Sequence, residues 1–520
     1  MLIDGRSLTQ ATPLQADICI VGAGAAGLTL AQALDGAPFS VLLIESGGLR
    51  EEAKIQSLAD GTSEEPYPFL DSRARCFGGT TSRWSGACIP LDPGDFEAAA
   101  WLPHSGWPFP HSALRPYYRR AFDIFGLPEA LPPIDATPFG KAPLSAKRVG
   151  YSHPLDLGRK YRQQILRSQN VTLVTHATVT ELVPDDEVRC VQELYLKSPE
   201  GQDLVVHPKT AILATGGIEN ARLLLASTRH CSNGLGNDHD LVGRFFMEHY
   251  YKVVGILPLG QRRRDVLPFT NVSPLGQSSD QSYGQGTFGL TDALRHQHHL
   301  LNMHLRFYRY SPLEGTSAVI AAKRLGKAAN SRDFKAIAAA GRRLLEKDWR
   351  VLPRYLGWHL WNKFDETAKF THVRLQAWLE QEPDPSNRVT LSSERDYLGQ
   401  PLAHLRLRCS DRMMQSVTRS LKHIDAALQS RGFGPLQYDT ARLAHLNPYD
   451  KIGLHHMGTT RMHPNPTQGV VDANCKVHSL ANLYLAGSSV FPTGGAANPT
   501  LTIAALALRL ADHIQTRKEI

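Results

Sequence analysis

The sequence predicts a protein of two parts, an α/β domain on a parallel sheet and an α+β domain on a large antiparallel sheet with helices. Near its start, a glycine-rich turn lies between an apolar strand and a helix. Residues 246–320 and 371–410 contain runs in which apolar and polar residues alternate, which is typical of antiparallel strands with one buried face. A chain of 520 residues is long enough for both units.

Residues 17–45 have the strand, turn, helix and second strand of a dinucleotide-binding unit. The strand at 18–21 leads into a turn in which Gly22, Gly24, Ala26 and Gly27 stand at G-x-G-x-x-G spacing. Such a turn lets the backbone approach a pyrophosphate at a helix N-terminus. The second strand ends at Glu45, 18 residues after Gly27, where a carboxylate can hold a ribose 2′-OH. The acid disfavours a 2′-phosphate, so we expect FAD or NAD rather than NADP; the alternative is a coincidental glycine-rich turn.

A second turn rich in small residues lies at 73–90, with the sequence RARCFGGTTSRWSGACIP. Small residues allow a backbone to lie against a flat ligand, and several N–H groups of such a turn can point the same way, as in an anion-binding nest. The turn is therefore a candidate cofactor contact, and the competing interpretation is an ordinary surface loop.

Residues 452–514 bring several chemical features together. The pair His455-His456 precedes a Gly-Thr turn, a short apolar strand is expected at 483–485, and a glycine-rich loop carries Asn498-Pro499 into a final helix. This order places a potential base, a strand end and a helix N-terminus close together on rigid elements.

Composition and charge exclude several classes. With 42% hydrophobic and 20% charged residues and no apolar run of about 18 residues, the chain reads as soluble and globular. The start of the chain lacks the features of a signal peptide. The seven cysteines are scattered and form no C-x-x-C pair, which favours a reducing cytoplasm and argues against disulfides or a metal site.

The net charge of +8 is concentrated in residues 323–363, which hold 11 basic and three acidic residues. The rest of the chain is balanced, so we do not expect a nucleic-acid binder. The segment also has apolar residues near one helical face: Phe334, Ile337, Ala338, Leu345, Trp349 and Leu352. It is either a helix packed on the second domain with a solvated basic face, or an interfacial helix that meets anionic lipid or an acidic partner.

Several blocks resemble, in order, those of the glucose-methanol-choline (GMC) flavoprotein oxidoreductases. They are the turn at Gly22, GGTTSRW, ILATGGIENARLLLAS at 212–227, VGRFFMEH at 242–249, NRVTLS at 387–392 and the stretch 452–514. The resemblance covers nearly the whole chain and is greatest to the pyranose-oxidase-like and sugar or polyol dehydrogenase branch. It implies a Rossmann-like FAD-binding domain of the p-hydroxybenzoate-hydroxylase type at 1–95, 155–245 and 445–520. The substrate domain would then comprise 96–154 and 246–444.

The resemblance also implies where the FAD would lie. Val179 would place its backbone against the adenine, Ser85 would face the reactive nitrogen of the flavin, and Pro499 would start a helix facing the flavin ring. The other expected contacts, besides the residues at 22–27 and Glu45, are Ser46, Arg75, Gly79, Thr80, Trp84, Ala214, Thr215, Gly487, Asn498 and Thr500.

In this family the catalytic base is the histidine of an H-x-x-G-T motif, which falls on His455 here. A neutral histidine can accept the hydroxyl proton when a hydride leaves the carbon. The partner that holds the same oxygen falls on Asn498, 43 residues later. His456 is the alternative base. Pyranose oxidases carry a flavin-linked histidine where this chain has Arg83, so we expect non-covalent FAD.

The expected function is FAD-dependent oxidation of a secondary alcohol to a ketone, the substrate being a ring hydroxyl of a sugar, glycoside or polyol. The reduced enzyme would be reoxidised by oxygen or a quinone-like acceptor. Two alternatives stay open. One is an oxidoreductase for a hydrophobic alcohol that docks through 323–363 to a membrane or carrier, and the other is a GMC-type lyase with structural FAD.

Overall fold

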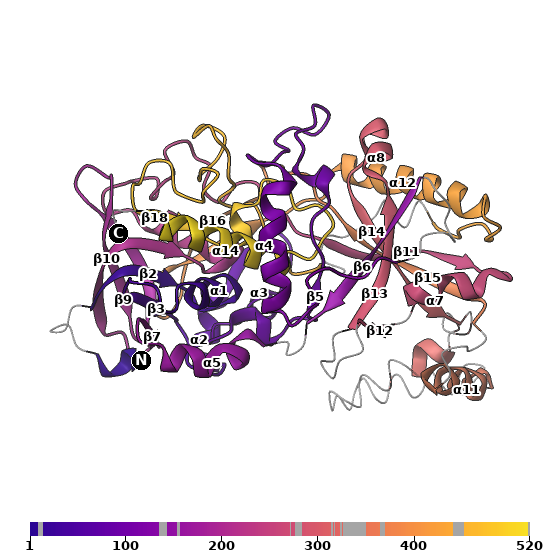
Figure 1. Ribbon diagram of the computed structural model, residues 1–520, viewed down its shortest axis with the longest axis horizontal. Helices are drawn as coiled ribbons and strands as arrows, with labels where there is room; N and C mark the ends of the chain where they lie inside the picture. Colours follow the sequence, from indigo (N-terminus) through magenta and orange to yellow (C-terminus); the bar gives the residue numbers. More distant parts are fainter. Residues whose placement is uncertain are drawn as a thin grey trace.

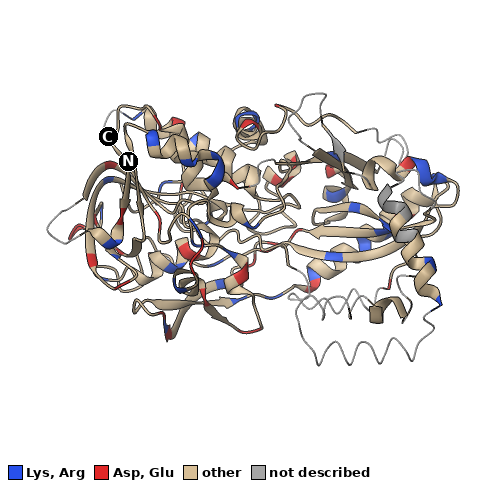
Figure 2. Ribbon diagram, turned by 90° about the horizontal axis from the view of Figure 1, so that it is seen from below, with Lys and Arg blue, Asp and Glu red and all other residues tan. Residues whose placement is uncertain are grey.

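The computed structural model describes residues 1–8, 14–134, 143–152, 156–270, 272–275, 283–311, 313, 316, 318–322, 325, 350–364, 370–439 and 452–517. It has an elongated shape with one large sheet in each half (Figure 1). Both ends of the chain lie in the half that carries the glycine-rich turn. Lys and Arg are spread over both halves, and several lie along the strands of the second sheet (Figure 2).

In the described part of the chain, the first sheet has eight strands. Their order is β1 (Leu2–Asp4), β7 (Val171–Thr175), β3 (Val41–Ile44), β2 (Leu14–Val21), β10 (Asp203–Leu213), β9 (Val191–Lys197) and β8 (Thr178–Pro184), with β18 (Leu483–Leu485) also paired to β10. The pairs from β1 to β10 and the pair β10–β18 are parallel, while β8, β9 and β10 pair antiparallel. The parallel nucleotide-binding sheet predicted from 17–45 is thereby confirmed.

Both faces of this sheet are covered. Ile18, Cys19 and Ile20 are consecutive in β2 and all are fully buried, which explains the unbroken apolar run in the sequence. The helices of this half of the molecule include α1 (Ala25–Ala33), α5 (Leu157–Arg167), α4 (His111–Ile124) and α14 (Thr500–Gln515). Helix α14 packs on both α1 and α4, so the last helix closes the layer over the first.

The second sheet is antiparallel and has seven strands among the residues that the structure describes. Their order is β11 (Tyr250–Pro258), β15 (His372–Leu379), β14 (Met303–Tyr310), β13 (Tyr283–Leu290), β6 (Leu144–Tyr151) and β5 (Ala87–Cys88), with β12 (Ser273–Pro274) paired to β13. Helix α12 (Asp411–Gln429) begins after the N-cap Ser410 and packs into the same core through Leu421 and Ile424. The expected antiparallel sheet of the second domain is confirmed.

One part of that expectation was wrong. Strands β16 (Arg388–Arg395) and β17 (Pro401–Arg406) do not join the large sheet but pair with β4 (Gly61–Ser63) in a sheet of three. They contact α6 (Gly216–Ala226), and Val389 and Leu405 belong to the core of the first half. Alternation in sequence identifies a strand with one buried face, but it does not specify which core that face covers.

The remaining α-helices of the described residues are α2 (Ala53–Gln56), α3 (Phe69–Ser72), α7 (Leu267–Thr270), α8 (Asp292–His298) and α11 (Val351–Phe364). Most of the basic segment 323–363 lies outside the described residues, apart from position 325 and residues 350–363, so the predicted amphipathic helix is not described there. Among the described residues, no helix is both long and apolar enough to cross a bilayer.

Candidate active site

A cavity of about 470 Å³ lies between the first sheet and the segments 71–85 and 453–456. Its walls come from parts of the chain far apart in sequence, including the ends of β2, β3 and β10 and the start of α14. Its volume falls in the range of small-molecule and cofactor sites. Gly24, Gly216 and Gly487 line it, and a Cβ added at Gly216 or Gly487 would meet nothing within 4 Å. These glycines leave space where a ligand can lie against the backbone.

The nucleotide end of the cavity is formed by the turn between β2 and α1. Gly22 has φ +99°, and a Cβ there would lie 2.8 Å from the carbonyl oxygen of Ala214. Gly24 is the N-cap of α1 and offers no side chain to that helix end, which leaves its N–H groups for an anion. Gly27 does not line the cavity; a Cβ there would lie 1.8 Å from the carbonyl oxygen of Gly22. Its contact is therefore with the turn rather than with a ligand.

Glu45 follows β3 and is 5% exposed. Its carboxylate accepts hydrogen bonds from the backbone N–H groups of Ala23, at 2.8 Å, and Gly47, at 3.1 Å. It also lines the cavity. The carboxylate thus links the glycine turn to the end of β3 and is placed where a ribose hydroxyl can donate to it. The glycine turn, the free helix start and this acid fit the dinucleotide part of FAD.

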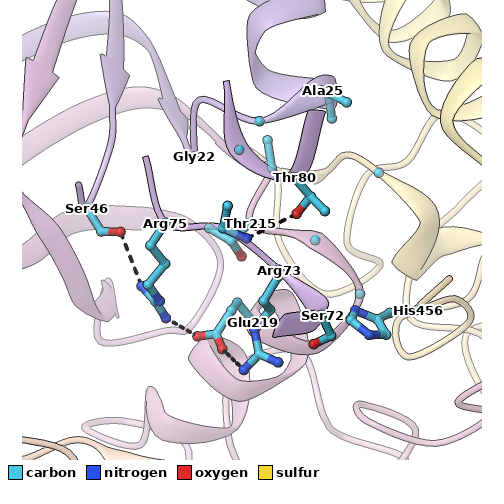
Figure 3. Close-up of a pocket in the computed structure, with 18 of the residues that line it drawn as sticks. Gly22, Ala25, Ser46, Ser72, Arg73, Arg75, Thr80, Thr215, Glu219 and His456 are labelled. Carbon is cyan, nitrogen blue, oxygen red and sulfur yellow. Dashed lines mark hydrogen bonds and ion pairs between the residues drawn. The ribbon is translucent and has the colours of Figure 1, made fainter. Parts of the chain in front are cut away.

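A cluster of charges forms the wall shown in Figure 3. Glu219 of α6 forms ion pairs with Arg73 at 2.7 Å and with Arg75 at 2.5 Å, and Arg75 also donates to Ser46. Burial alone would raise the pKa of Glu219, but Arg75, Arg222 and Arg73 outweigh it and lower this pKa to about 2. Nε and Nη1 of Arg73 and Nε of Arg75 have no hydrogen-bond partner among the described residues. These unpaired N–H groups are themselves buried beside the cavity.

Seventeen of the eighteen residues expected to contact the cofactor line this cavity, and only Gly27 does not. They are Gly22, Gly24, Ala26, Glu45, Ser46, Arg75, Gly79, Thr80, Trp84, Ser85, Val179, Ala214, Thr215, Gly487, Asn498, Pro499 and Thr500. Their individual contacts with FAD stay predictions. Arg83 also lines the cavity, and its guanidinium pairs with Glu51.

His455 and Asn498 lie together at the other end of the cavity. The amide nitrogen of Asn498 is 3.4 Å from Nε2 of His455, and both residues line the cavity wall. Leu454, directly before His455, has φ +59°, a left-handed conformation uncommon for leucine and often found at functional sites. The opposite ring nitrogen of His455, Nδ1, lies 2.8 Å from Nδ1 of His249.

A buried carboxylate holds the backbone of both histidines. Oε1 of Glu248 accepts hydrogen bonds from the backbone N–H groups of His455, at 2.6 Å, and His249, at 2.9 Å, and Oε2 accepts one from the hydroxyl of Tyr67. Burial raises the pKa of Glu248 to about 7. Burial also lowers the pKa of His249 to about 4 and that of His455 well below its usual value, the latter with help from His249 and His456. Both imidazoles are therefore neutral near pH 7, and a neutral imidazole is the form that can accept a proton.

His456 faces a different environment from His455. Its ring lies 6.0 Å from that of Tyr67 and 5.9 Å from that of Phe246, and burial lowers its pKa to about 3. Nε2 of His456 has no hydrogen-bond partner among the described residues. His456 also lines the cavity, but the contact with Asn498 belongs to His455.

The sequence did not single out several residues of this site. His249 and Glu248 stand in the VGRFFMEH block, but no spacing links them to His455, which lies 206 positions from His249. The link depends on two bridges, between Met247 and Met457 and between Tyr250 and Ile452. Arg73 and Glu219 were likewise not predicted as an ion pair, because ion pairs across 146 positions leave no local pattern.

Several known proteins resemble this chain in sequence, and several solved structures resemble it in fold. A family model described as GMC oxidoreductase matches residues 383–507. The fructose dehydrogenase large subunit of Gluconobacter japonicus is 24% identical, with 96% of this chain and 98% of that protein covered. The 6'''-hydroxyparomomycin C oxidase of Streptomyces lividus is also 24% identical, with 96% and 92% covered. Among solved structures, a formate oxidase of Aspergillus oryzae matches with a TM-score of 0.54 and 18% identity, over 96% of this chain and 98% of that one.

These matches extend over both halves of the chain, and the family model spans β16, β17, β18 and the first half of α14. The cavity joins a dinucleotide-binding turn to a histidine and an asparagine, so fold, site and similarity agree. Residues 383–507 match the GMC oxidoreductase model, and the chain is an FAD-binding oxidoreductase that acts on CH–OH groups.

Proposed function

We propose that this enzyme oxidises a secondary alcohol to a ketone, with His455 as the general base and Asn498 as the group that holds the reacting oxygen. The observation that carries the proposal is the 3.4 Å contact between Nδ2 of Asn498 and Nε2 of His455 at one end of the cavity. The other end has the glycine turn and Glu45. Bound FAD would supply the hydride acceptor.

The two side chains act on the same substrate hydroxyl group, one as proton acceptor and the other as hydrogen-bond donor. His455 is neutral, so Nε2 can take the hydroxyl proton, an effect worth about 10²–10⁴ in rate. The Asn498 amide donates a hydrogen bond to the same oxygen and fixes its position, which directs the hydrogen on the carbon toward the cofactor. Asn498 is 8% exposed and precedes α14, so a packed helix start holds its position.

The substrate class proposed is a ring hydroxyl of a sugar, glycoside or polyol. Two relatives support it, since one is named for fructose and the other for 6'''-hydroxyparomomycin C. One of these names says dehydrogenase and the other oxidase. Oxygen and a quinone-like compound are therefore both retained as electron acceptors.

We propose further that FAD is held without a covalent bond. Arg83 occupies the position where pyranose oxidases carry a linking histidine, and its guanidinium pairs with Glu51. Precipitation of the protein in acid should release all of the yellow colour into the supernatant. Colour retained in the pellet would refute this part of the proposal.

The main test is anaerobic mixing of the yellow enzyme with sugars, polyols and other alcohols. A substrate should bleach the flavin, and His455→Ala should slow this reduction by about 10²-fold or more without losing FAD. His230→Ala is the matched control, because His230 is exposed and lies outside the cavity. Reduction of His455→Ala at the wild-type rate would refute the assigned base.

The lyase alternative predicts a different result. A GMC-type lyase would convert its substrate while the absorbance of the flavin stays constant, so product formation without bleaching would favour it.

The alternative of docking to a membrane or carrier rests on 323–363, most of which lies outside the described residues. Co-sedimentation with anionic vesicles at low salt tests it directly.

We place the protein in a reducing compartment such as the cytoplasm, a proposal supported by its seven unpaired cysteines.

A further inference from the structure

His249 and His455 form a pair of imidazoles at the end of the cavity. Their Nδ1 atoms are 2.8 Å apart and their rings are nearly perpendicular, at 89°. A contact of this length between two ring nitrogens requires one proton between them. Which ring carries that proton decides whether Nε2 of His455 has a lone pair.

The environment of Nε2 of His249 determines which of the two rings carries the shared proton. Nε2 of His249 lies 2.8 Å from the carbonyl oxygen of Gly495, and a carbonyl oxygen can only accept a hydrogen bond. Nε2 of His249 therefore carries a proton. Since burial lowers the pKa of His249 to about 4, the ring holds only this proton near neutral pH. Its Nδ1 is then an acceptor.

Gly495 is itself fixed from the other side. The backbone N–H of Gly495 acts on the carboxyl of Glu380 and lowers its pKa, against the larger opposite effect of burial. A Cβ at Gly495 would lie 2.2 Å from Oδ2 of Asp95, so this carboxylate packs directly against the glycine. Asp95 in turn accepts from Asn302 at 2.8 Å. The carbonyl that orients His249 thus belongs to a loop anchored in the second sheet.

We propose that His249 is a positioning residue that sets the tautomer of His455. Because Nδ1 of His249 accepts, Nδ1 of His455 must donate, and the neutral His455 ring carries its proton on Nδ1. Its Nε2 is then left with a lone pair, directed at the side of Asn498 where the substrate hydroxyl would lie. This inference rests on the proposed function for its catalytic meaning, but the tautomer is a property of the protein alone.

The pair is also held by its backbone. Both His455 and His249 donate their backbone N–H to the same oxygen of Glu248, and the N–H of Gly453 donates to the carbonyl oxygen of His249 at 2.7 Å. These three backbone hydrogen bonds fix the relative position of the two rings. When Nε2 of His455 accepts a proton, the bond to His249 continues to hold the charged ring in place.

Two substitutions separate the two hydrogen bonds of His249. His249→Asn places a carbonyl oxygen near the position of Nδ1 and keeps an acceptor for His455. His249→Gln places its amide near the position of Nε2; it keeps a donor for Gly495 but loses the acceptor for His455. FAD content and thermal midpoint serve as folding controls for both variants.

The first readout is ¹⁵N NMR of the imidazole nitrogens, with the His455 signals identified by their loss in His455→Asn. The wild-type protein should show the Nδ1-protonated tautomer for His455, and His249→Gln should show the Nε2-protonated tautomer or a mixture. An Nε2-protonated His455 in the wild type would overturn the proposal, whatever the result for activity.

The second readout is the limiting rate of anaerobic flavin reduction. His249→Gln should lower it about 10-fold or more at saturating substrate, with little change in substrate affinity, and His249→Asn should recover most of the loss. Equal losses in the two variants would assign His249 a merely structural role and reject the tautomer mechanism. If His455→Ala reduces normally while the NMR result holds, the proposed function fails and the tautomer assignment survives.

Discussion

The side-chain amide of Asn498 lies 3.4 Å from Nε2 of His455, although the two residues reach this position from separate elements, a loop before α14 and a segment after residue 452. Neither belongs to the glycine turn that would bind the nucleotide. The contact places one donor and one acceptor side by side at the cavity wall. A hydroxyl group bridging them would be held by two bonds.

Replacement of Asn498 tests the donor. Asn498→Ala should slow anaerobic flavin reduction by about 10²–10³-fold, the usual cost of losing one donor at an oxygen that gains charge. Asn498→His offers a donor again and should recover part of the rate. Stopped-flow absorbance measures both, and Asn465→Ala in an exposed loop is the control. An unchanged rate in Asn498→Ala would remove this residue from the mechanism.

Glu45→Ala tests the nucleotide end. The change removes the acceptor of the Ala23 and Gly47 N–H groups and the expected partner of the ribose. Each unsatisfied group costs about 1–3 kcal/mol, so the dissociation constant of FAD should rise about 10-fold or more. Flavin content after gel filtration and titration of the apoprotein measure the effect. Glu187→Ala is the control, since that side chain is 68% exposed, and equal flavin content in both variants would argue against the assigned role.

Gly495→Ala tests the loop that anchors the histidine pair. Gly495 has φ +52°, and its new Cβ would lie 2.2 Å from Oδ2 of Asp95. The strained backbone alone costs about 1–2 kcal/mol, and the steric conflict adds to it. Gly201→Ala isolates the first cost, because Gly201 has φ +86° and open space around it. Thermal unfolding should show a clearly larger loss for Gly495→Ala, and two similar losses would mean that the loop can shift.

The stability of the protein should depend on pH through Glu248. Burial raises the pKa of this carboxyl from 4.5 to about 7, so the folded protein keeps a proton that the unfolded chain releases. This contribution is complete below pH 4.5 and is lost as the pH rises to about 7. Across that window the wild type should lose about 1.4 kcal/mol per pH unit relative to Glu248→Gln, which cannot titrate.

Urea unfolding of both proteins at pH 5 and pH 8 measures this difference. The glutamine can still accept from the backbone of His455 and His249, so the comparison isolates the proton. A difference in unfolding free energy that stays constant between the two pH values would show that Glu248 is already ionised in the folded protein at pH 5.

The sequence was sufficient for features that are local. The strand at 483–485 and the turn from Gly22 to Gly27 both follow from short-range patterns, and the structure confirms them. The resemblance added His455 and Asn498, whose proximity is visible only in three dimensions.

What the sequence did not predict depends on packing between distant segments. Alternation marked β16 and β17 as strands, but the sheet they form is completed by β4, which pairs with β17 from more than 300 residues earlier. His249 carries no periodic or motif signal of its own, and its role follows from a 2.8 Å contact that only the fold creates. The same holds for Glu219, which three arginines of two segments surround.

The pairing of β18 with β10 and the packing of α14 on α1 have a consequence for biosynthesis. Residues 483–515 leave the ribosome long after β2, α1 and β10, so the nascent chain exposes a strand edge and an apolar helix face for most of its synthesis. Asn498, Pro499 and Thr500 belong to this late segment. The wall of the cavity is therefore completed late in the synthesis of the chain, and chaperones have a long interval in which to bind the open half-domain.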